Sequence, residues 1–460
     1  MTVLEVNRPG SASSGAGQQV ISSATPASVR PLSVPRGVAL YVGALFGPGL
    51  LMLPGLAAGI AGPASVLAWA GLLAVSALFA LVFTALGTRF PDGGGVIAYT
   101  AAGLGRRAGR AVGWCFLVAV VLGAPVVCLI GAGYVTALTG GGRGATSLVA
   151  ALLLAGVTAL TTAGARAGTA VQMVLVAVLL AVVVVAVAGS LPSARASHWT
   201  PFAPHGWSAV GSAASVLMLS FVGWEAAAPL TRRLADPARS LPRITAMAFG
   251  VTTVVYLALA VAVVAVLGAG AAGTVPAADL LRVAVGSVGP AIAAGAAVVL
   301  TLAAVNSYLT GAAALVAHLR AEQDQSSAAR ATADEPRSGE HASDEPGSDE
   351  HRSGARGFFV WIAVAGCVEL TAEAFGLVDA TRMITLTTSL FLVVYVASMA
   401  SATRVLTGWL RVAAGLACAA SAVVLGFAGV SAVLAGLVGI GGLVVQAGAR
   451  SKNRPADPLA

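Results

Sequence analysis

One acidic residue, Glu225, stands near the middle of a long apolar stretch, whereas most other acidic residues fall in tails or loops. A carboxylate inside hydrocarbon costs about 2.5–3.5 kcal/mol on insertion scales, so it persists only if it faces the protein interior, finds a partner or holds a proton. An ionisable group in this position marks a functional site by default. The alternative is structural, because a protonated Glu225 can hydrogen-bond a backbone carbonyl and hold helices together. The two roles can coexist.

Helix-breaking residues interrupt this stretch and the first apolar stretch of the chain. Gly223 lies two residues before Glu225, and Gly47-Pro48-Gly49 lies within the first stretch. Proline removes a backbone donor and clashes with the preceding turn, while glycine permits non-helical torsions. One such kink in a membrane helix is common and carries little weight alone. Two of them at matching positions predict a pair of interrupted helices.

Interrupted helices offer charges that suit a zwitterion. Each break leaves unpaired N–H groups at the start of one half-helix and unpaired C=O groups at the end of the other. The N–H ends favour a carboxylate, and the C=O ends favour an ammonium group. An amino acid carries both, so the breaks predict a site for it. Phe46, Leu50, Leu219 and Phe221 would then contact its apolar side chain.

Catalytic and metal-binding patterns do not accompany these breaks in the sequence. The five histidines lie at the ends of apolar stretches or in loops, and the four cysteines lie inside such stretches without a CxxC pair. Glu369 and Glu373 are one helical turn apart, but neither a nucleophile nor a metal-ligand cluster accompanies them. We therefore expect no catalysis, no metal and no cofactor. A membrane-embedded enzyme or a receptor is the less favoured alternative.

The elements that position these groups are membrane-spanning helices. Only 10% of the 460 residues are charged and 58% are hydrophobic, whereas soluble domains carry about 25% charged residues. Apolar stretches of about 20 residues cross a lipid bilayer as helices, because their backbone polar groups are then satisfied internally. The sequence predicts an all-α polytopic membrane protein. We expect about twelve transmembrane helices, at 37–61, 64–88, 109–138, 146–163, 168–189, 208–231, 241–268, 284–318, 357–373, 381–402, 409–428 and 431–448.

The positive charges predict how the chain is oriented. With the N-terminus inside, 22 of the 26 Lys and Arg residues fall in cytoplasmic segments. The other four lie outside, and they are Arg143, Arg195, Arg282 and Arg382. This asymmetry favours a multi-pass protein of the cytoplasmic membrane with both termini inside. The net charge of +8 sits in short loops without a basic-aromatic stripe, which argues against a nucleic-acid partner.

Three polar segments frame the expected transmembrane domain of residues 36–448. Residues 1–35 are rich in Ser, Ala, Gly and Pro and are expected to form a disordered cytoplasmic tail. Residues 320–356 hold nine of the eighteen acidic residues and are expected to form a disordered cytoplasmic loop. Residues 449–460 are expected to form a second cytoplasmic tail.

The two breaks occupy equivalent places if the domain is built from two repeats. We expect a first repeat at about 37–189, a second at about 208–402, and two extra helices at about 409–448. Interrupted helices at corresponding positions of inverted repeats are the best sequence indication of a transporter's binding site.

Four motifs carry a resemblance to a known family. The first interrupted helix reads Gly-x-x-x-Gly-Pro-Gly-x-x-x-x-Pro from Gly43 to Pro54, and residues 91–99 read Pro-x-x-Gly-Gly-x-x-x-Tyr. Residues 220–225 read Ser-Phe-x-Gly-x-Glu, and 236–242 read Asp-Pro-x-Arg-x-x-Pro. Together they resemble the amino acid–polyamine–organocation (APC) superfamily of permeases over most of the chain. Within the superfamily, the chain resembles bacterial exporters of L-methionine and branched-chain amino acids.

This resemblance implies a five-plus-five inverted-repeat (LeuT-like) core with helices 1 and 6 interrupted, followed by two C-terminal helices. It also implies that Glu225 couples transport to protonation or gating. Asn306 and Tyr308 either line the site or form hydrogen bonds between helices. The substrate-binding residues expected in this way are Phe46, Gly47, Pro48, Gly49, Leu50, Ser220, Phe221, Val222, Gly223, Asn306 and Tyr308.

The chain departs from the family pattern at two places that bear on mechanism. Pro48 replaces the small polar residue often found between the two glycines, so the site loses an N–H and a hydroxyl group. Residues 168–189 contain no lysine, so the mechanism of relatives that use a lysine there does not carry over. We expect secondary active transport of amino acids. Export of neutral apolar amino acids is the first hypothesis, and uptake or exchange is the alternative. The exact substrate, the coupling ion (with protons as the candidate) and the oligomeric state stay open.

Overall fold

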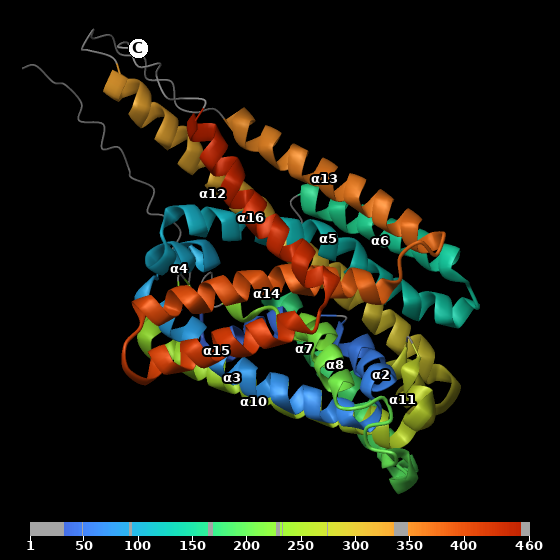
Figure 1. Cartoon of the computed structure of the whole chain (residues 1–460). Coiled ribbons are helices and arrows are strands. Elements are labelled where there is room, and N and C mark those ends of the chain that lie inside the picture. Colours follow the sequence, from blue (N-terminus) through green and yellow to red (C-terminus); the bar gives the residue numbers. More distant parts are fainter. Residues whose placement is uncertain are drawn as a thin grey trace, which may run out of the picture. The chain divides into compact units, whose positions relative to one another are not determined.

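The structure is a computed structural model that describes residues 32–47, 49–91, 94–163, 169–226, 231, 233–273, 275–334 and 348–451. Within these residues every regular element is a helix, which confirms the all-α class (Figure 1). Pro48, most of the predicted N-terminal tail, residues 335–347 and residues 452–460 lie outside the described residues. Helical backbone continues to Asp334 and resumes at Ser348. Residues 320–334 and 348–356, at the two ends of the segment expected to be a disordered loop, are therefore helical.

The helices follow one another with short connections. Those of the first half are α1 (Val34–Leu45), α2 (Gly49–Ala61), α3 (Ser65–Arg89), α4 (Gly95–Leu104), α5 (Arg106–Thr139), α6 (Arg143–Thr162) and α7 (Thr169–Ser190). Those of the second half are α8 (Ser208–Leu217), α10 (Pro237–Ala262), α11 (Pro276–Val285), α12 (Gly289–Asp334), α13 (Ser348–Ala374), α14 (Ala380–Val405), α15 (Gly408–Gly426) and α16 (Val430–Ser451). Short 3-10 turns η4 (Met218–Phe221) and η5 (Trp224–Ala226) follow α8.

Nine helical stretches in the described residues are long and apolar enough to cross a membrane. Two of them, Gly49–Arg89 and Pro276–Ala317, each join two successive helices. The shorter apolar helices include Val34–Leu45 and Ser208–Phe221, which are halves of the two spans predicted to be interrupted. A broken span falls below the length of an intact one, and the predicted twelfth span is found as the shorter helix Val430–Gly441. The nine stretches therefore correspond to nine of the twelve predicted spans, and the two broken spans and the twelfth account for the other three.

Both breaks occur where the sequence predicts them. Helix α1 ends at Leu45 and α2 begins at Gly49. In the sixth span Val222 is extended and Gly223 has φ +132°, a value that L side chains rarely adopt. The backbone is therefore non-helical at both points.

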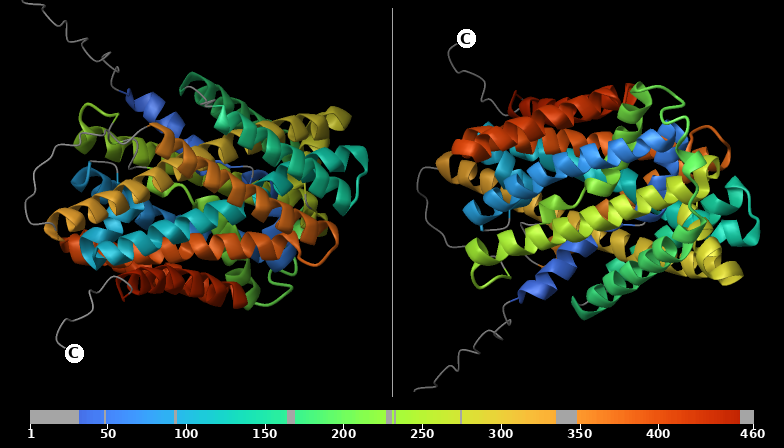
Figure 2. Two further views of the ribbon diagram at one scale, coloured as in Figure 1. Left: turned by 90° about the horizontal axis from the view of Figure 1, so that it is seen from above. Right: turned by 90° about the horizontal axis from the view of Figure 1, so that it is seen from below.

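Four pairs of equivalent spans from the two halves pack against each other. Helix α2 contacts α8, α3 contacts α10, α5 contacts α12, and α6 contacts α13. This is the pairing of spans 1 with 6, 2 with 7, 3 with 8 and 4 with 9 that two repeats of five would form. Helices α15 and α16 lie along one flank of the bundle in both views of Figure 2.

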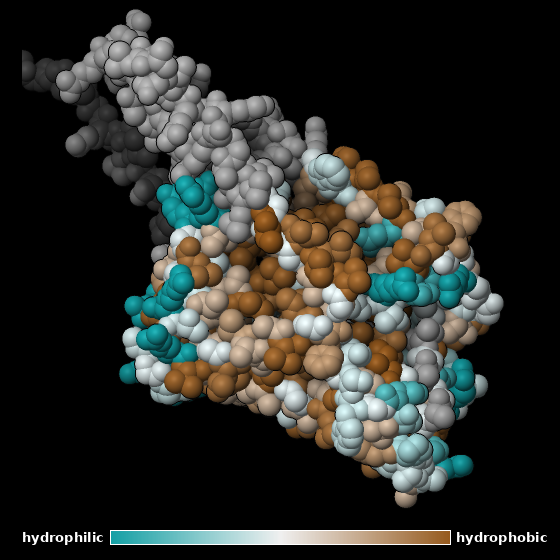
Figure 3. All heavy atoms as spheres, viewed as in Figure 1, coloured by the Kyte–Doolittle hydropathy of each residue, from teal (hydrophilic) through white to brown (hydrophobic). Residues whose placement is uncertain are grey.

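Two short helices were absent from the predicted spans. Helix α4 connects the second span to the third, and α11 precedes the eighth. Each has ten residues, which is too short to cross a bilayer. Apolar residues cover the middle of the face in Figure 3, and hydrophilic ones gather toward its two ends, as expected for a protein that crosses a membrane.

Candidate functional site

The two breaks touch each other at the centre of the bundle. The hydroxyl of Tyr256 on α10 lies 3.0 Å from the carbonyl oxygen of Leu45 and 2.7 Å from that of Ser220. It can donate its one proton to either of them. A Cβ added at Gly223 would lie 2.7 Å from the carbonyl oxygen of Ala44. Only glycine therefore fits where the sixth span crosses the end of α1.

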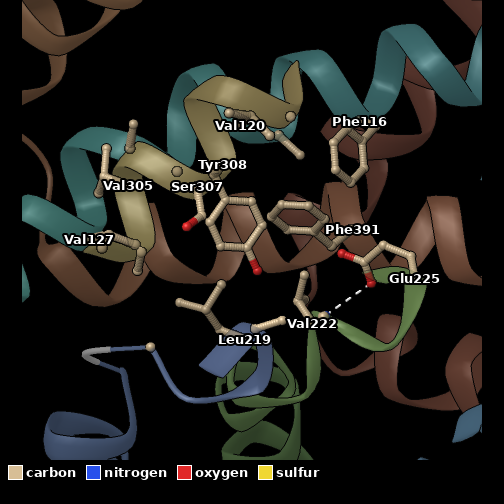
Figure 4. Close-up of a pocket in the computed structure, with 18 of the residues that line it drawn as sticks. Phe116, Val120, Val127, Leu219, Val222, Glu225, Val305, Ser307, Tyr308 and Phe391 are labelled. Carbon is tan, nitrogen blue, oxygen red and sulfur yellow. Dashed lines mark hydrogen bonds between the residues drawn. The ribbon is translucent and has the colours of Figure 1, made fainter. Parts of the chain in front are cut away.

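Glu225 is held at the break by its own backbone and by a distant helix. Its Oε2 accepts a hydrogen bond from the Gly223 amide at 2.9 Å and from the Tyr395 hydroxyl of α14 at 2.5 Å (Figure 4 draws the first of these). Among the described residues three ion pairs form, and Glu225 takes part in none of them. Its carboxyl group therefore links the sixth span to the tenth through neutral donors.

Tyrosine hydroxyls bind the backbone of both interrupted spans. Tyr41 donates to the carbonyl oxygen of Trp224 at 2.8 Å, and Tyr134 donates to that of Leu51 at 2.7 Å. The Tyr395 hydroxyl also accepts from the Trp224 amide at 3.3 Å. The hydroxyl of a buried tyrosine usually finds a hydrogen-bond partner, and breaks supply free carbonyl groups. The chain has six tyrosines, and four of them bind groups of the interrupted spans although none of the four was predicted to do so. They are Tyr41, Tyr134, Tyr256 and Tyr395.

A cavity of about 520 Å³ opens beside the breaks. Figure 4 shows Phe116, Phe391 and Tyr308 on one side of it, facing Leu219 and Val222 of the sixth span. Phe391 contacts the other two rings, with centroids 5.6 Å from Phe116 and 6.3 Å from Tyr308. The cavity therefore has an aromatic wall opposite the broken helices.

The cavity extends from the breaks toward one end of the bundle. Its lining includes residues 94–97 at the start of α4, and Gly311 and Leu315 of α12. Helix α4 lies at the end of the molecule where the C-terminal part of α12 projects (Figure 1). By the predicted orientation this is the arginine-rich, cytoplasmic end.

Most of the residues predicted to bind substrate line this cavity. They are Gly47, Gly49, Leu50, Ser220, Val222, Gly223 and Tyr308, together with Glu225. The structure does not describe Pro48, so the prediction for that residue stays open.

Three of the predicted residues point elsewhere. Phe46 is 2% exposed and packs on Tyr256, with ring centroids 5.5 Å apart. Phe221 packs on Tyr256 as well and on Trp69, at 5.3 and 5.9 Å. Asn306 Oδ1 accepts a hydrogen bond of 2.7 Å from the hydroxyl of Thr161 on α6. Asn306 therefore forms a hydrogen bond between helices, which was one of its two predicted roles, whereas Tyr308 lines the cavity. The two phenylalanines fill the core behind the breaks.

Two buried hydroxyl groups in the cavity lining have no hydrogen-bond partner within the described part of the chain. They belong to Ser220, which was predicted, and to Thr387 of α14, which was not. Ser220 is 5% exposed and Thr387 is 1% exposed. Buried polar groups are normally paired, so these hydroxyls are available to a polar group of a bound molecule.

The remaining acidic pair lies apart from the cavity. Glu373 of α13 accepts a hydrogen bond from the hydroxyl of Ser147 on α6, and neither Glu369 nor Glu373 lines the cavity. In the described residues no group of three or more His, Cys, Asp or Glu side chains could hold a metal ion.

Comparison with known families agrees with this geometry. The family described as amino acid permease matches residues 32–321. The chain belongs to the amino acid permease family. The match to this permease covers α1 to the greater part of α12, and so includes both breaks and every cavity residue except Thr387 and Phe391.

Several curated proteins are similar to the permease. It is 30% identical over 288 residues to the Bacillus subtilis protein named uncharacterized amino acid permease YecA. The matched region covers 62% of this chain and 68% of YecA. It is 32% identical over 229 residues to the L-methionine/branched-chain amino acid exporter YjeH of Escherichia coli, covering 49% and 54%. It is 26% identical over 237 residues to the branched-chain amino acid permease BcaP of B. subtilis, covering 47% and 51%. The chain thus spans about half the length of the last two.

Proposed function

We propose that this permease exports neutral apolar amino acids, of the methionine and branched-chain type, across the cytoplasmic membrane by alternating access. Both termini would lie inside the cell. The observation that carries the proposal is the cavity, which is bounded on one side by both helix breaks and on the other by an aromatic and aliphatic wall. Such a site offers polar groups for the amino acid backbone and apolar surface for its side chain.

The polar half of the site suits a zwitterion. Helix α2 begins at Gly49, so the amides of its first turn have no partners within that helix. The Leu50 amide donates to the Gly47 carbonyl oxygen at 3.1 Å, and the other amides of the turn favour a carboxylate. Glu225 is the one formally charged side chain among the described residues that line the cavity, and it favours an ammonium group. An acidic amino acid would add a second carboxylate to this site without a cation to balance it.

The apolar half of the site suits a linear or branched aliphatic side chain. Its residues are Phe116, Val120, Val127, Leu219, Val305 and Phe391. Removing a Leu, Ile, Val or Met side chain from water contributes about 1.5–3 kcal/mol. Methionine would gain a further contact of about 0.3–1.5 kcal/mol between its sulfur and an aromatic ring.

Protonation of Glu225 would act on the break itself. As a carboxylate it accepts hydrogen bonds from the Gly223 amide and the Tyr395 hydroxyl. Once protonated, it carries a donor of its own and has less capacity to accept. The sixth span and α14 would then be joined less tightly, which couples proton uptake to movement of the break.

Similarity to named relatives supports both directions of transport. YjeH is named an exporter and BcaP a permease, so uptake or exchange is the second candidate. The same site can work in either direction, because the gradients of substrate and coupling ion across the membrane set the direction of net transport.

Counterflow in proteoliposomes tests the proposal. Vesicles loaded with unlabelled methionine should accumulate labelled methionine, leucine, isoleucine and valine, but not glutamate. An imposed proton gradient should change the rate of net methionine movement. Counterflow of glutamate in place of the apolar amino acids would refute the substrate class, and rates indifferent to the proton gradient would refute the coupling.

A further inference from the structure

Helix α14 carries four hydroxyl side chains close together, and one of them is unlike the others. The hydroxyls of Thr385, Thr388 and Ser389 each donate to the backbone carbonyl oxygen four residues earlier, at 2.7 Å. Threonine and serine in helices commonly make this bond. The hydroxyl of Thr387 does not make it and has no other partner among the described residues. Its hydrogen-bonding capacity is therefore unused by the protein.

The methyl group of Thr387 packs against α5. A Cβ added at Gly123 would lie 2.9 Å from this methyl group, so the missing side chain at Gly123 makes room for it. Valine has nearly the same shape as threonine and would fill the gap without the hydroxyl. A buried hydroxyl without a partner costs free energy. Packing therefore accounts for the methyl group of Thr387 but not for its hydroxyl.

The unpartnered hydroxyl belongs to the wall of the cavity that lies opposite the breaks. Thr387 and Gly123 both line the cavity. Val120 and Val127 lie about one turn to either side of Gly123, and Phe391 lies one turn from Thr387; all three line the cavity too. Thr387 is 1% exposed and Val120 is 2% exposed, so only a molecule that fits closely against this wall can reach the hydroxyl.

The other hydroxyls of the cavity lining are placed differently. Ser307 donates to a carbonyl oxygen of its own helix at 2.9 Å. Ser220 lies beside the start of α2, because a Cβ at Gly49 would be 3.9 Å from its hydroxyl. Tyr308 directs its hydroxyl toward the sixth span in Figure 4. Ser220 and Tyr308 therefore face the groups that suit the main chain of an amino acid, which leaves Thr387 for the side chain.

A hydroxyl in this place suits a side chain that carries a hydroxyl itself. Threonine has the shape of valine with a hydroxyl in place of one methyl group. Each of two facing hydroxyls can donate or accept, so the pair would satisfy both. A wholly apolar pocket disfavours threonine relative to valine by roughly a hundredfold. One hydroxyl in the wall reduces that discrimination.

We propose that the cavity also accepts threonine, and that the Thr387 hydroxyl hydrogen-bonds the hydroxyl of the threonine side chain. The inference rests on the proposed function, because it uses the same cavity and the same placement of the ammonium and carboxylate groups. It extends the substrate class from apolar amino acids to a small hydroxylated one. Thr387 then determines how well threonine competes with valine.

Counterflow of threonine tests this inference. The full-length permease is reconstituted in proteoliposomes loaded with unlabelled threonine, valine or methionine, and accumulation of the same labelled amino acid is measured over a range of concentrations. The wild type should accumulate all three. The ratio of the half-maximal concentrations of threonine and valine reports on the hydroxyl, because the two side chains differ only there.

An isosteric variant and a neighbouring control isolate the hydroxyl. Thr387→Val leaves the hydroxyl of bound threonine without a partner, so the half-maximal concentration of threonine should rise at least about fivefold relative to that of valine. Thr387→Ser keeps a hydroxyl and should restore the wild-type ratio. Thr388→Val removes a hydroxyl that bonds its own helix and does not line the cavity, so it should leave the ratio unchanged. Thr387→Ala replaces the valine variant if that does not fold.

Two results would overturn the inference. One is a wild type that accumulates methionine and valine but not threonine, which leaves the proposed function standing. The other is the same ratio in the Thr387→Val and Thr388→Val variants, which would show that threonine does not use the hydroxyl. Accumulation of threonine without methionine or valine, with the loss in Thr387→Val intact, would contradict the proposed substrate class instead and support the assignment of Thr387.

Discussion

The break in the sixth span depends on one hydroxyl group of a neighbouring helix, so Tyr395→Phe is the sharpest perturbation of the site. The hydroxyl lies 2.5 Å from Glu225 Oε2 and accepts from the amides of Gly223 and Trp224 at 3.2 and 3.3 Å. The ring packs edge-on against Phe79 with a centroid distance of 4.8 Å, and phenylalanine would keep that contact. The substitution therefore isolates the hydrogen bonds.

The size of the effect follows from which groups lose their partners. Gly223 keeps Glu225 as an acceptor at 2.9 Å, whereas the buried Trp224 amide loses the acceptor supplied by Tyr395. A buried donor left without a partner costs about 1–3 kcal/mol. We expect the free energy of unfolding to fall by about that amount. We also expect a higher methionine concentration for half-maximal counterflow, because the break is part of the cavity wall.

Tyr99→Phe is the matched control. The Tyr99 hydroxyl is buried and has no hydrogen-bond partner among the described residues, and its ring also packs on Phe83. Removing it should change the free energy of unfolding by less than about 1 kcal/mol. Both variants are compared by chemical denaturation in detergent and by methionine counterflow. Equal stability of the two variants would refute the assignment of Tyr395 as the residue that holds the break.

Three further predictions follow from the same geometry. Glu225→Gln keeps the side chain's shape but cannot exchange a proton, so counterflow should persist at a rate that no longer changes with pH; a retained pH profile would contradict the coupling role. Gly223→Ala strains a φ of +132° and brings a Cβ to 2.7 Å from the Ala44 oxygen, so folded protein should be lost on gel filtration, whereas Gly47→Ala meets nothing within 4 Å and should fold normally. Phe391→Leu removes an aromatic contact to sulfur of about 0.3–1.5 kcal/mol, so methionine should lose up to about tenfold in affinity relative to leucine, measured as the ratio of their inhibition constants.

The interrupted helices could be predicted because their causes are local. Glycine and proline act on the backbone at their own positions, and Gly47, Gly49 and Gly223 lie at the observed breaks. The all-α membrane class could be predicted for a similar reason, since apolar length and charge composition are read directly from the chain. Neither prediction requires knowledge of the tertiary contacts between helices.

The sequence could not predict the directions in which the side chains around the breaks point. Helical periodicity assigns a side chain to a face only while the backbone stays helical, and it is lost at Phe46 and between Phe221 and Gly223. Both phenylalanines were expected at the substrate, and both pack into the core. Thr387 was missed because its place on the cavity depends on the packing of α14.

The tyrosine contacts were missed because their partners are far away in sequence. Tyr41 binds a carbonyl group 183 positions along the chain, and Tyr395 binds a carboxylate 170 positions away. A single sequence shows that a buried tyrosine needs an acceptor but not which one. The short helix α4 was missed because ten residues next to a glycine-rich loop give too little periodic signal.

The central claim is that the cavity between the breaks and the aromatic wall holds the substrate, and binding of labelled methionine to purified Gly49→Val protein tests it most directly. Gly49 and Ser220 both line the cavity. A Cβ at Gly49 would lie 3.2 Å from Leu53 and 3.9 Å from the Ser220 hydroxyl, so the methyl groups of valine would crowd the start of α2 where it borders the cavity. We predict that the wild type binds methionine, that leucine but not glutamate displaces it, and that folded Gly49→Val protein does not bind it. Wild-type affinity in the folded variant would contradict the account and move the site elsewhere.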